Sequence, residues 1–145
     1  MFGISENKQE GAMMTPEEFR VIREGLGLTQ AALSEKLEVN RRTIRRWEDP
    51  TSGYTAPEGV SDWMEQQWGL YADRVADAMD AAEEMEAQGE PATLIAYSDE
   101  LECMTRTGLS IEEHTALLGH IAMALTCADI DFEIIEATPN RGNKT

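Results

Sequence analysis

The chain has 145 residues and a formal net charge of −16, with 41% hydrophobic and 28% charged residues. This length can hold one medium domain or two small modules, and the composition is typical of a globular protein. The longest nearly apolar stretch, residues 120–128, is too short to cross a bilayer, so we expect a cytoplasmic protein without a membrane segment. Cys103 and Cys127 are too few for a disulfide framework, and we expect free thiols near a core.

Positive charge is concentrated in the first half of the chain. Residues 15–65 hold seven basic and ten acidic side chains, whereas residues 66–145 hold four and sixteen. The segment NRRTIRRWE, residues 40–48, contains four of the twelve Lys and Arg residues. The second half alone is therefore unsuited to a polyanion, but the first half can bind one if its bases share a surface.

The predicted order begins with a helix near residue 16. Residues 1–14 are polar and aperiodic, so we expect a disordered leader. Thr15 and Glu18 have the spacing of a capping box, in which each side chain bonds the backbone of the other. Apolar residues at helical spacing then predict a helix over about 16–26, which Gly27 ends.

Two short helices are predicted next. Thr29 is a good cap for residues 30–37, QAALSEKL, and after the turn EVN, Asn40 is a good cap for residues 41–48, RRTIRRWE. Helices of this length are marginal by themselves, so packing on the first helix must stabilise both of them.

The third helix has two chemically different sides on a helical wheel. Ile44 and Trp47 share one side, and burying them would turn the other side outward. That other side carries Arg41, Arg42, Arg45 and Arg46. Charge runs are usually only solvated faces, but the preceding helix and turn favour a helix-turn-helix, whose second helix enters the DNA major groove. Arginine suits such a surface because its fork can contact O6 and N7 of guanine together or hold a phosphate.

Residues 57–88 predict one long helix, which Gly89 and Pro91 stop. Seven of its residues keep a heptad spacing over three heptads, and we call them the seam. They are Met64, Trp68, Tyr71, Val75, Ala78, Ala82 and Met85. The seam fits either packing on the same chain or pairing with a second copy, and we favour pairing as the basis of dimerisation. Gly69 lies inside the pattern and is a candidate break, because glycine in a helix costs about 1 kcal/mol.

The last part of the chain predicts a strand, two helices and a strand. The strands are residues 92–97 and 132–137, and the longer helix spans about 111–129. Ser98 is predicted to cap the shorter helix, which ends near Gly108. A two-stranded sheet is marginal alone, and a second copy would complete it.

The predicted fold class is mostly α, with a small β-α-α-β module at the C-terminus. The predicted parts are a disordered leader (1–14), a helix-turn-helix domain (15–56), a long connecting helix (57–90), an α/β dimerisation module (91–137) and a disordered tail (138–145). His114 and His120 do not face alike on their helix, and no further ligand joins them at metal-binding spacing, so we expect no metal or cofactor. The chain has no glycine-rich phosphate loop and no nucleophile motif, so we expect no enzyme.

The stretch LGLTQAALSEKLEVNRRTIRRWE, residues 26–48, closely resembles the Xre/Cro-type, lambda-repressor-like helix-turn-helix family. The resemblance extends over residues 15 to about 60. The sequence departs from the family pattern at Ser34, at Glu38 and at Asp49-Pro50. Because the family usually has glycine at the position of Glu38, this residue would have to adopt a left-handed conformation at some cost.

The resemblance also implies roles for individual residues. Base edges in double-stranded DNA would be read by Arg41, Arg42 and Arg46. The DNA backbone would be contacted by Gln30, Asn40, Thr43 and Arg45. An ion pair between Arg23 and Glu48 would join the first helix to the end of the recognition helix.

The order of elements after residue 56 resembles the anti-CRISPR-associated (Aca) repressors and related small regulators, whose C-terminal part dimerises. Together the two resemblances imply a homodimeric transcriptional regulator, most plausibly an autorepressor on an inverted-repeat operator. The main alternative is an antitoxin or adaptor, in which the C-terminal module binds another protein and DNA binding is autoregulatory. A DNA-mimicking inhibitor is a third hypothesis, but the acidic side chains are spread along the second half of the chain and are not spaced like the phosphates of DNA.

Overall fold

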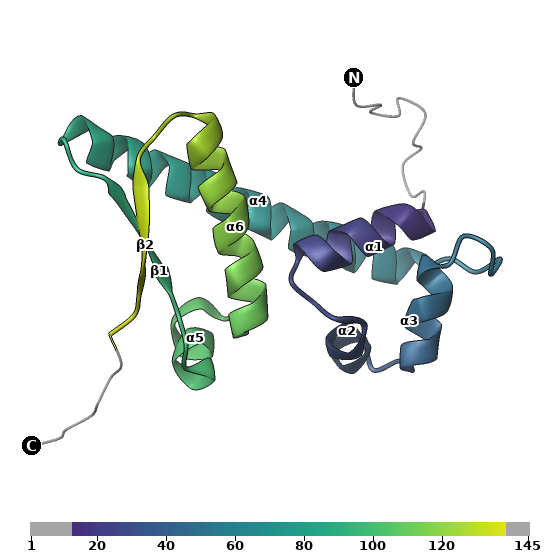
Figure 1. The fold of residues 1–145 in the computed structure, drawn as a ribbon. Coiled ribbons are helices and arrows are strands. Elements are labelled where there is room, and N and C mark those ends of the chain that lie inside the picture. Colours follow the sequence, from purple (N-terminus) through teal and green to yellow (C-terminus); the bar gives the residue numbers. More distant parts are fainter. Residues whose placement is uncertain (1–12, 139–145) are drawn as a thin grey trace, which may run out of the picture. The chain divides into compact units, whose positions relative to one another are not determined.

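The computed structural model describes residues 13–138, which form six helices and two strands (Figure 1). The fold is mostly helical, as the sequence predicts, with a helix-turn-helix first, a long helix next and a small sheet last. The chain divides into two compact units. Of the described residues, the first contains 13–24 together with 28–68, and the second contains 25–27 together with 69–138. The division falls inside the long helix, not at either end of it.

Three helices build the first unit around a small core. They are α1 (Pro16–Gly25), α2 (Gln30–Leu37) and α3 (Arg41–Glu48). The predicted capping box starts α1, since the Thr15 N–H donates to Glu18 Oε1 at 2.9 Å and the Glu18 N–H donates to Thr15 Oγ1 at 3.1 Å. Phe19, Leu33 and Ile44 are fully buried, one from each helix. Because each helix is short, this shared core is what stabilises all three.

The sequence prediction placed Met14 in the disordered leader, but this residue is part of the folded first unit. Met14 is 1% exposed, and its N–H donates to Ser61 Oγ at 3.1 Å in the interior of the first unit. Residue 14 therefore belongs to the fold, because burying its side chain repays the cost of ordering it. The rest of the predicted leader, residues 1–12, lies outside the described residues, as do residues 139–145 of the predicted tail.

The turn between α2 and α3 has the conformation that the sequence requires. Glu38 has φ 55° and ψ 44°, which is left-handed backbone. Its N–H donates to Glu35 O at 3.3 Å, and the Val39 N–H donates to Ser34 O at 3.0 Å. These bonds satisfy the last carbonyls of α2, and they offset the roughly 1–2 kcal/mol that a side chain costs in this conformation.

The long helix α4 (Glu58–Ala87) contributes to both units, and its helical bounds run through Gly69, the predicted break. The second unit adds β1 (Ala92–Ala96), α5 (Glu100–Thr107), α6 (Ile111–Cys127) and β2 (Phe132–Glu136). The strands are parallel, with Ala92 opposite Phe132 and Ala96 opposite Glu136. Parallel neighbours need a long connection, which α5 and α6 supply, and α6 packs beside β1 (Figure 1).

Two details of the second unit differ from the sequence predictions. Asp99, not Ser98, caps α5, because its carboxylate accepts the Glu102 N–H at 2.8 Å. Ser98 lies one residue too early and instead donates its hydroxyl to Glu136 Oε2 at 3.0 Å. Of the two free cysteines, Cys103 is buried as expected, but Cys127 at the end of α6 is exposed.

Candidate nucleic-acid interface

Helix α3 has the two sides that the helical wheel predicts. Ile44 is fully buried and Trp47 is 8% exposed, and the Trp47 ring meets Phe19 of α1 edge-on, with 5.8 Å between centroids. Asn40 caps the helix by accepting the Arg42 N–H on Oδ1 at 2.7 Å. The four arginines are all exposed, namely Arg41, Arg42, Arg45 and Arg46. The buried side anchors the helix, so the guanidinium side is free to meet a polyanion.

Arg23 and Glu48 form a buried ion pair. Arg23 Nε lies 2.5 Å from Glu48 Oε2, and Nη2 donates to Oε1 at 3.1 Å. The side chains are only 9% and 6% exposed. Arg23 Nη1 also donates to the Leu28 carbonyl at 2.8 Å. The pair therefore joins the end of α1 to the end of α3, as the resemblance implied, and its separation is well inside the usual 4 Å ion-pair limit.

Gln30 belongs to the same hydrogen-bond network. It is the first residue of α2, and its Nε2 donates to Glu48 Oε1 at 3.1 Å. An amide NH₂ has two hydrogens, so this bond leaves one that can donate to a phosphate. Glu48 thus holds the side chain of Gln30 in one orientation. Thr43, the remaining predicted backbone contact besides Asn40 and Arg45, is half-buried on α3.

Tyr54 is a candidate interface residue that the sequence reasoning missed. The guanidinium carbon of Arg46 lies 5.4 Å from the centroid of the Tyr54 ring, which is a cation–π distance. Tyr54 is 57% exposed. It lies eight residues after Arg46 in a loop, so no helical periodicity connects the two. The only sequence signal was an aromatic residue close behind an arginine-rich helix.

The loop that carries Tyr54 is built by its own side chains. Asp49 Oδ1 accepts from the Thr51 N–H at 2.9 Å and from the Thr51 hydroxyl at 2.8 Å. These two bonds, the backbone one first, lower the pKa of the Asp49 carboxyl. Ser52 donates its hydroxyl to the Arg46 carbonyl at 2.7 Å, and Gly53 supplies a φ of 80°. The loop therefore returns the chain to the last turn of α3.

The helices and turn of the first unit are similar to those of a known family. Residues 19–49 match the model of a helix-turn-helix family. The chain therefore contains a DNA-binding helix-turn-helix domain. The matched segment runs from Phe19 in α1 to the residue after α3, so it includes all of α2, the turn and the arginine side. No curated protein matches the chain.

The seam is divided between the cores of the two units. Met64 is fully buried in the first unit, and Tyr71 and Ala82 are 5% and 2% exposed in the second. The Tyr71 hydroxyl donates to the Leu26 carbonyl at 2.8 Å, and burial raises the pKa of this phenol, with a smaller effect from Glu113. A residue buried in its own chain is not free to pair with a second copy. A continuous coiled coil along all seven seam residues is therefore incompatible with this burial.

The two histidines of α6 have separate partners in the second unit. His120 Nε2 donates to the Gly25 carbonyl at 2.7 Å, and the His114 ring meets Tyr97 edge-on at 5.2 Å. Burial lowers the pKa of His114, and the positive charge of Arg74 lowers it further. Among the described residues no three metal-ligating side chains gather at one place, and no helix is long and apolar enough to cross a membrane.

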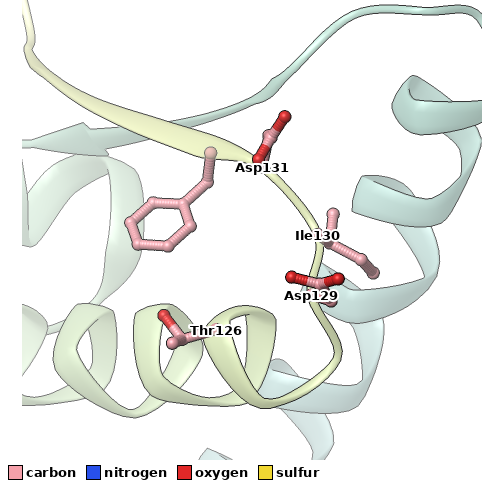
Figure 2. A pocket seen from close by; sticks show the side chains of 5 residues that line it. Thr126, Asp129, Ile130 and Asp131 are labelled. Carbon is pink, nitrogen blue, oxygen red and sulfur yellow. The ribbon is translucent and has the colours of Figure 1, made fainter.

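A hollow of about 230 Å³ lies at the connection between the end of α6 and the start of β2. Its lining includes the carboxylates of Asp129 and Asp131, with Thr126 on the last turn of α6 (Figure 2). Asp129 takes a φ of 60°, which reverses the chain toward the strand. The two acidic residues make this hollow an unfavourable place for a phosphate group.

Proposed function

We propose that the chain is a sequence-specific transcriptional regulator that acts as a homodimer and represses its own or a neighbouring operon. The observation that carries the proposal is the outward arginine side of α3, held by the burial of Ile44 and Trp47. Four guanidinium groups on one exposed helical side suit the donor and acceptor pattern of the major groove. The resemblance of the C-terminal part to the Aca repressors supports the repressor role.

The arginines have different roles in this proposal. Arg41, Arg42 and Arg46 read base edges, and Arg45 lies nearer the DNA backbone. Gln30 and Asn40, at the first turns of α2 and α3, contact phosphates together with Thr43. Helix N-termini suit phosphates because their free N–H groups and dipole favour negative charge.

A dimer explains how a small arginine surface can bind one site selectively. A single recognition helix contacts few phosphates, so its affinity is low and depends strongly on salt. Two copies related by a twofold axis bind an inverted repeat whose half-sites lie about 34 Å apart, one helical turn of DNA. We place the contacts between copies in residues 57–137.

The acidic half is compatible with this role. Residues 66–145 carry sixteen acidic and four basic side chains. At physiological salt, charges separated by more than about 8 Å are largely screened, so acidic side chains away from the phosphates cost little affinity. They also reduce binding to random DNA. Adding lysines between residues 73 and 90 should therefore raise the affinity for random DNA, and an unchanged affinity would contradict this role.

Selection from a random library of double-stranded DNA tests the proposal. The wild-type chain should enrich an inverted repeat with half-site centres about 10 base pairs apart. Its binding constant should fall steeply with salt, in proportion to the phosphates contacted. The same selection with Arg42→Ala should lose preference at one position of each half-site. Arg20→Ala is a matched control, because it removes one exposed charge from α1 at a side chain paired with Glu24. A wild-type chain that enriches no sequence would contradict the proposal.

The rival function is an antitoxin or adaptor whose second unit binds another protein. Exposed apolar side chains of that unit favour it, since Leu101 on α5 is 77% exposed and Met123 on α6 is 63% exposed. Co-purification from the native host distinguishes the two functions. An equimolar second protein bound to residues 69–138 would support the rival, whereas a homodimer with an operator would support the repressor.

A further inference from the structure

The outer edge of β2 has no strand partner among the described residues. β2 pairs with β1 on one side, and no other strand of residues 13–138 lies on its second side. Ile134 and Ile135 are 49% and 45% exposed, and neighbouring residues of a strand point to opposite faces. Both faces of β2 and its free edge are therefore open. An exposed edge with apolar side chains is a template for pairing with another strand.

The observed hydrogen bonds determine which backbone groups point to the free edge. Ala92 donates its N–H to the Asp131 carbonyl at 3.1 Å, and Ala137 donates its N–H to the Ala96 carbonyl at 2.8 Å. Asp131 and Ala137 therefore face β1. Backbone groups alternate sides along a strand, so every second residue between these two faces away from β1. The outward residues are Phe132, Ile134 and Glu136.

We propose that β2 of a second copy pairs antiparallel with this edge, around a twofold axis that passes through Ile134. The result is a four-stranded sheet in which the two β2 strands are central and each β1 is outermost. This inference rests on the homodimer of the proposed function and assigns its interface. In a twofold interface the same residues meet on both sides, so the outward groups of one β2 must face the outward groups of the other.

The outward groups of the two copies meet whichever residue of β2 lies on the axis, and charge together with strand overlap selects one register. With Ile134 opposite its own copy, Phe132 lies opposite Glu136 and Glu133 lies opposite Ile135, so no two carboxylates face each other. A shift centred on Glu136 places that residue opposite its own copy. A shift centred on Phe132 places Asp131 opposite Glu133. A register centred on Glu133 likewise places that residue opposite its own copy, and like charges directly across a strand pair are destabilising. A register centred on Ile135 opposes no carboxylates, but it pairs only residues 134–136 of β2 with one another, whereas the register centred on Ile134 pairs all five residues of the strand. The register centred on Ile134 is therefore preferred.

The apolar side chains also favour this register. Two Ile134 side chains would meet at the axis on one face of the sheet, and the stem of Glu133 would cover Ile135 on the other. The free edge of β1 is a poorer candidate, because its Leu94 and Ile95 are already half-buried in a single chain. A sheet of four strands is also past the size at which small sheets are marginal.

A proline on the free edge tests the pairing. The N–H of Ile134 points away from β1, so Ile134→Pro removes a bond to the second copy and none within the chain. Analytical ultracentrifugation should give a dimer, with twice the chain mass of 16.1 kDa, for the wild type. At the same concentration Ile134→Pro should give the mass of a monomer. Thr93→Pro is the matched control, because the N–H of Thr93 points to the free edge of β1. This variant should remain a dimer, and circular dichroism checks that both variants keep their helices.

Cysteine cross-linking tests the register without a proline. Opposite residues of an antiparallel pair have Cα atoms about 4.5–5.5 Å apart, within the range that a disulfide spans. In a Cys127→Ser background, which removes the exposed native thiol, Ile134→Cys should form a covalent dimer under mild oxidation. Thr93→Cys in the same background should not.

The outcomes separate this interface from the proposed function. A monomeric wild type, a dimeric Ile134→Pro variant, or a disulfide through position 93 in place of 134 would each overturn the interface. A wild type that selects an operator while Ile134→Pro remains dimeric contradicts the interface alone. A dimer that cross-links at position 134 but selects no DNA contradicts the regulator and leaves the interface standing.

Discussion

Removing Arg23 should strongly destabilise the first unit. Its side chain is 9% exposed and makes two contacts with Glu48 and one hydrogen bond to the Leu28 carbonyl. Arg23→Met keeps most of the apolar stem but leaves the 6% exposed Glu48 carboxylate with Gln30 as a donor and no cation in the pair. Breaking a buried pair by removing one partner costs about 3–5 kcal/mol.

Urea unfolding of the wild type and the variants measures this cost as the change in the free energy of unfolding. The double variant Arg23→Met/Glu48→Leu removes both charges, so it should lose less stability than Arg23→Met alone. Arg20→Ala is the control for losing an exposed charge from the same helix, and it should cost less than about 1 kcal/mol. If Arg23→Met cost no more than Arg20→Ala, the ion pair would not join α1 to α3 in the way described.

Three further changes have expected results. Gly27 and Gly89 both have φ of 79°, but an added Cβ at Gly27 would lie 2.4 Å from a backbone oxygen whereas Gly89 is open. Alanine at 89 should therefore cost only about 1–2 kcal/mol of left-handed strain and alanine at 27 clearly more, as urea unfolding will show. The lowered pKa of His114 means that the fold favours its neutral form, so this residue's stability contribution is present above pH 6.5 and decreases as pH falls below it. His114→Gln should reduce the loss of unfolding free energy between pH 7.5 and 5.5, and an unchanged loss would refute this assignment. Under the proposal that Arg46 reads a base pair, Tyr54→Leu should reduce discrimination at that base pair by about 2- to 5-fold and Tyr54→Phe should not. Equal weakening on all sequences would reassign Tyr54 to backbone contact.

Local rules were sufficient to predict the first unit closely. The caps Thr15, Thr29 and Asn40 act through single side-chain bonds to nearby N–H groups, so the sequence alone locates the helices that they begin. The predicted helix over 41–48 has the same bounds as α3, and the left-handed turn at Glu38 is present. Periodicity also predicts the burial of Ile44 and Trp47, because their spacing places them on one side of a helix whatever they pack against.

Contacts between segments that are far apart in the sequence, or that involve loops, could not be predicted from the sequence. The seam has a regular heptad spacing, but spacing does not tell whether the covering surface comes from the same chain or from another. Met64, Tyr71 and Ala82 are covered within a single chain. The contact of Tyr54 with Arg46 depends on how a loop with no periodicity returns to α3. The capping of α5 by Asp99 was missed because Ser98 and Asp99 are both good caps and only the strand end decides between them.

We propose that the exposed arginines of α3 read DNA sequence. The most direct test measures the affinity of Arg42→Ala and Arg20→Ala, which each lose one positive charge, for the selected operator and for scrambled DNA. Arg42→Ala should weaken operator binding by about 1–3 kcal/mol relative to the wild type and should affect binding to scrambled DNA less. Arg20→Ala should bind both DNAs almost as the wild type does. Equal effects of the two variants, or an Arg42→Ala variant that keeps full operator preference, would contradict the claim.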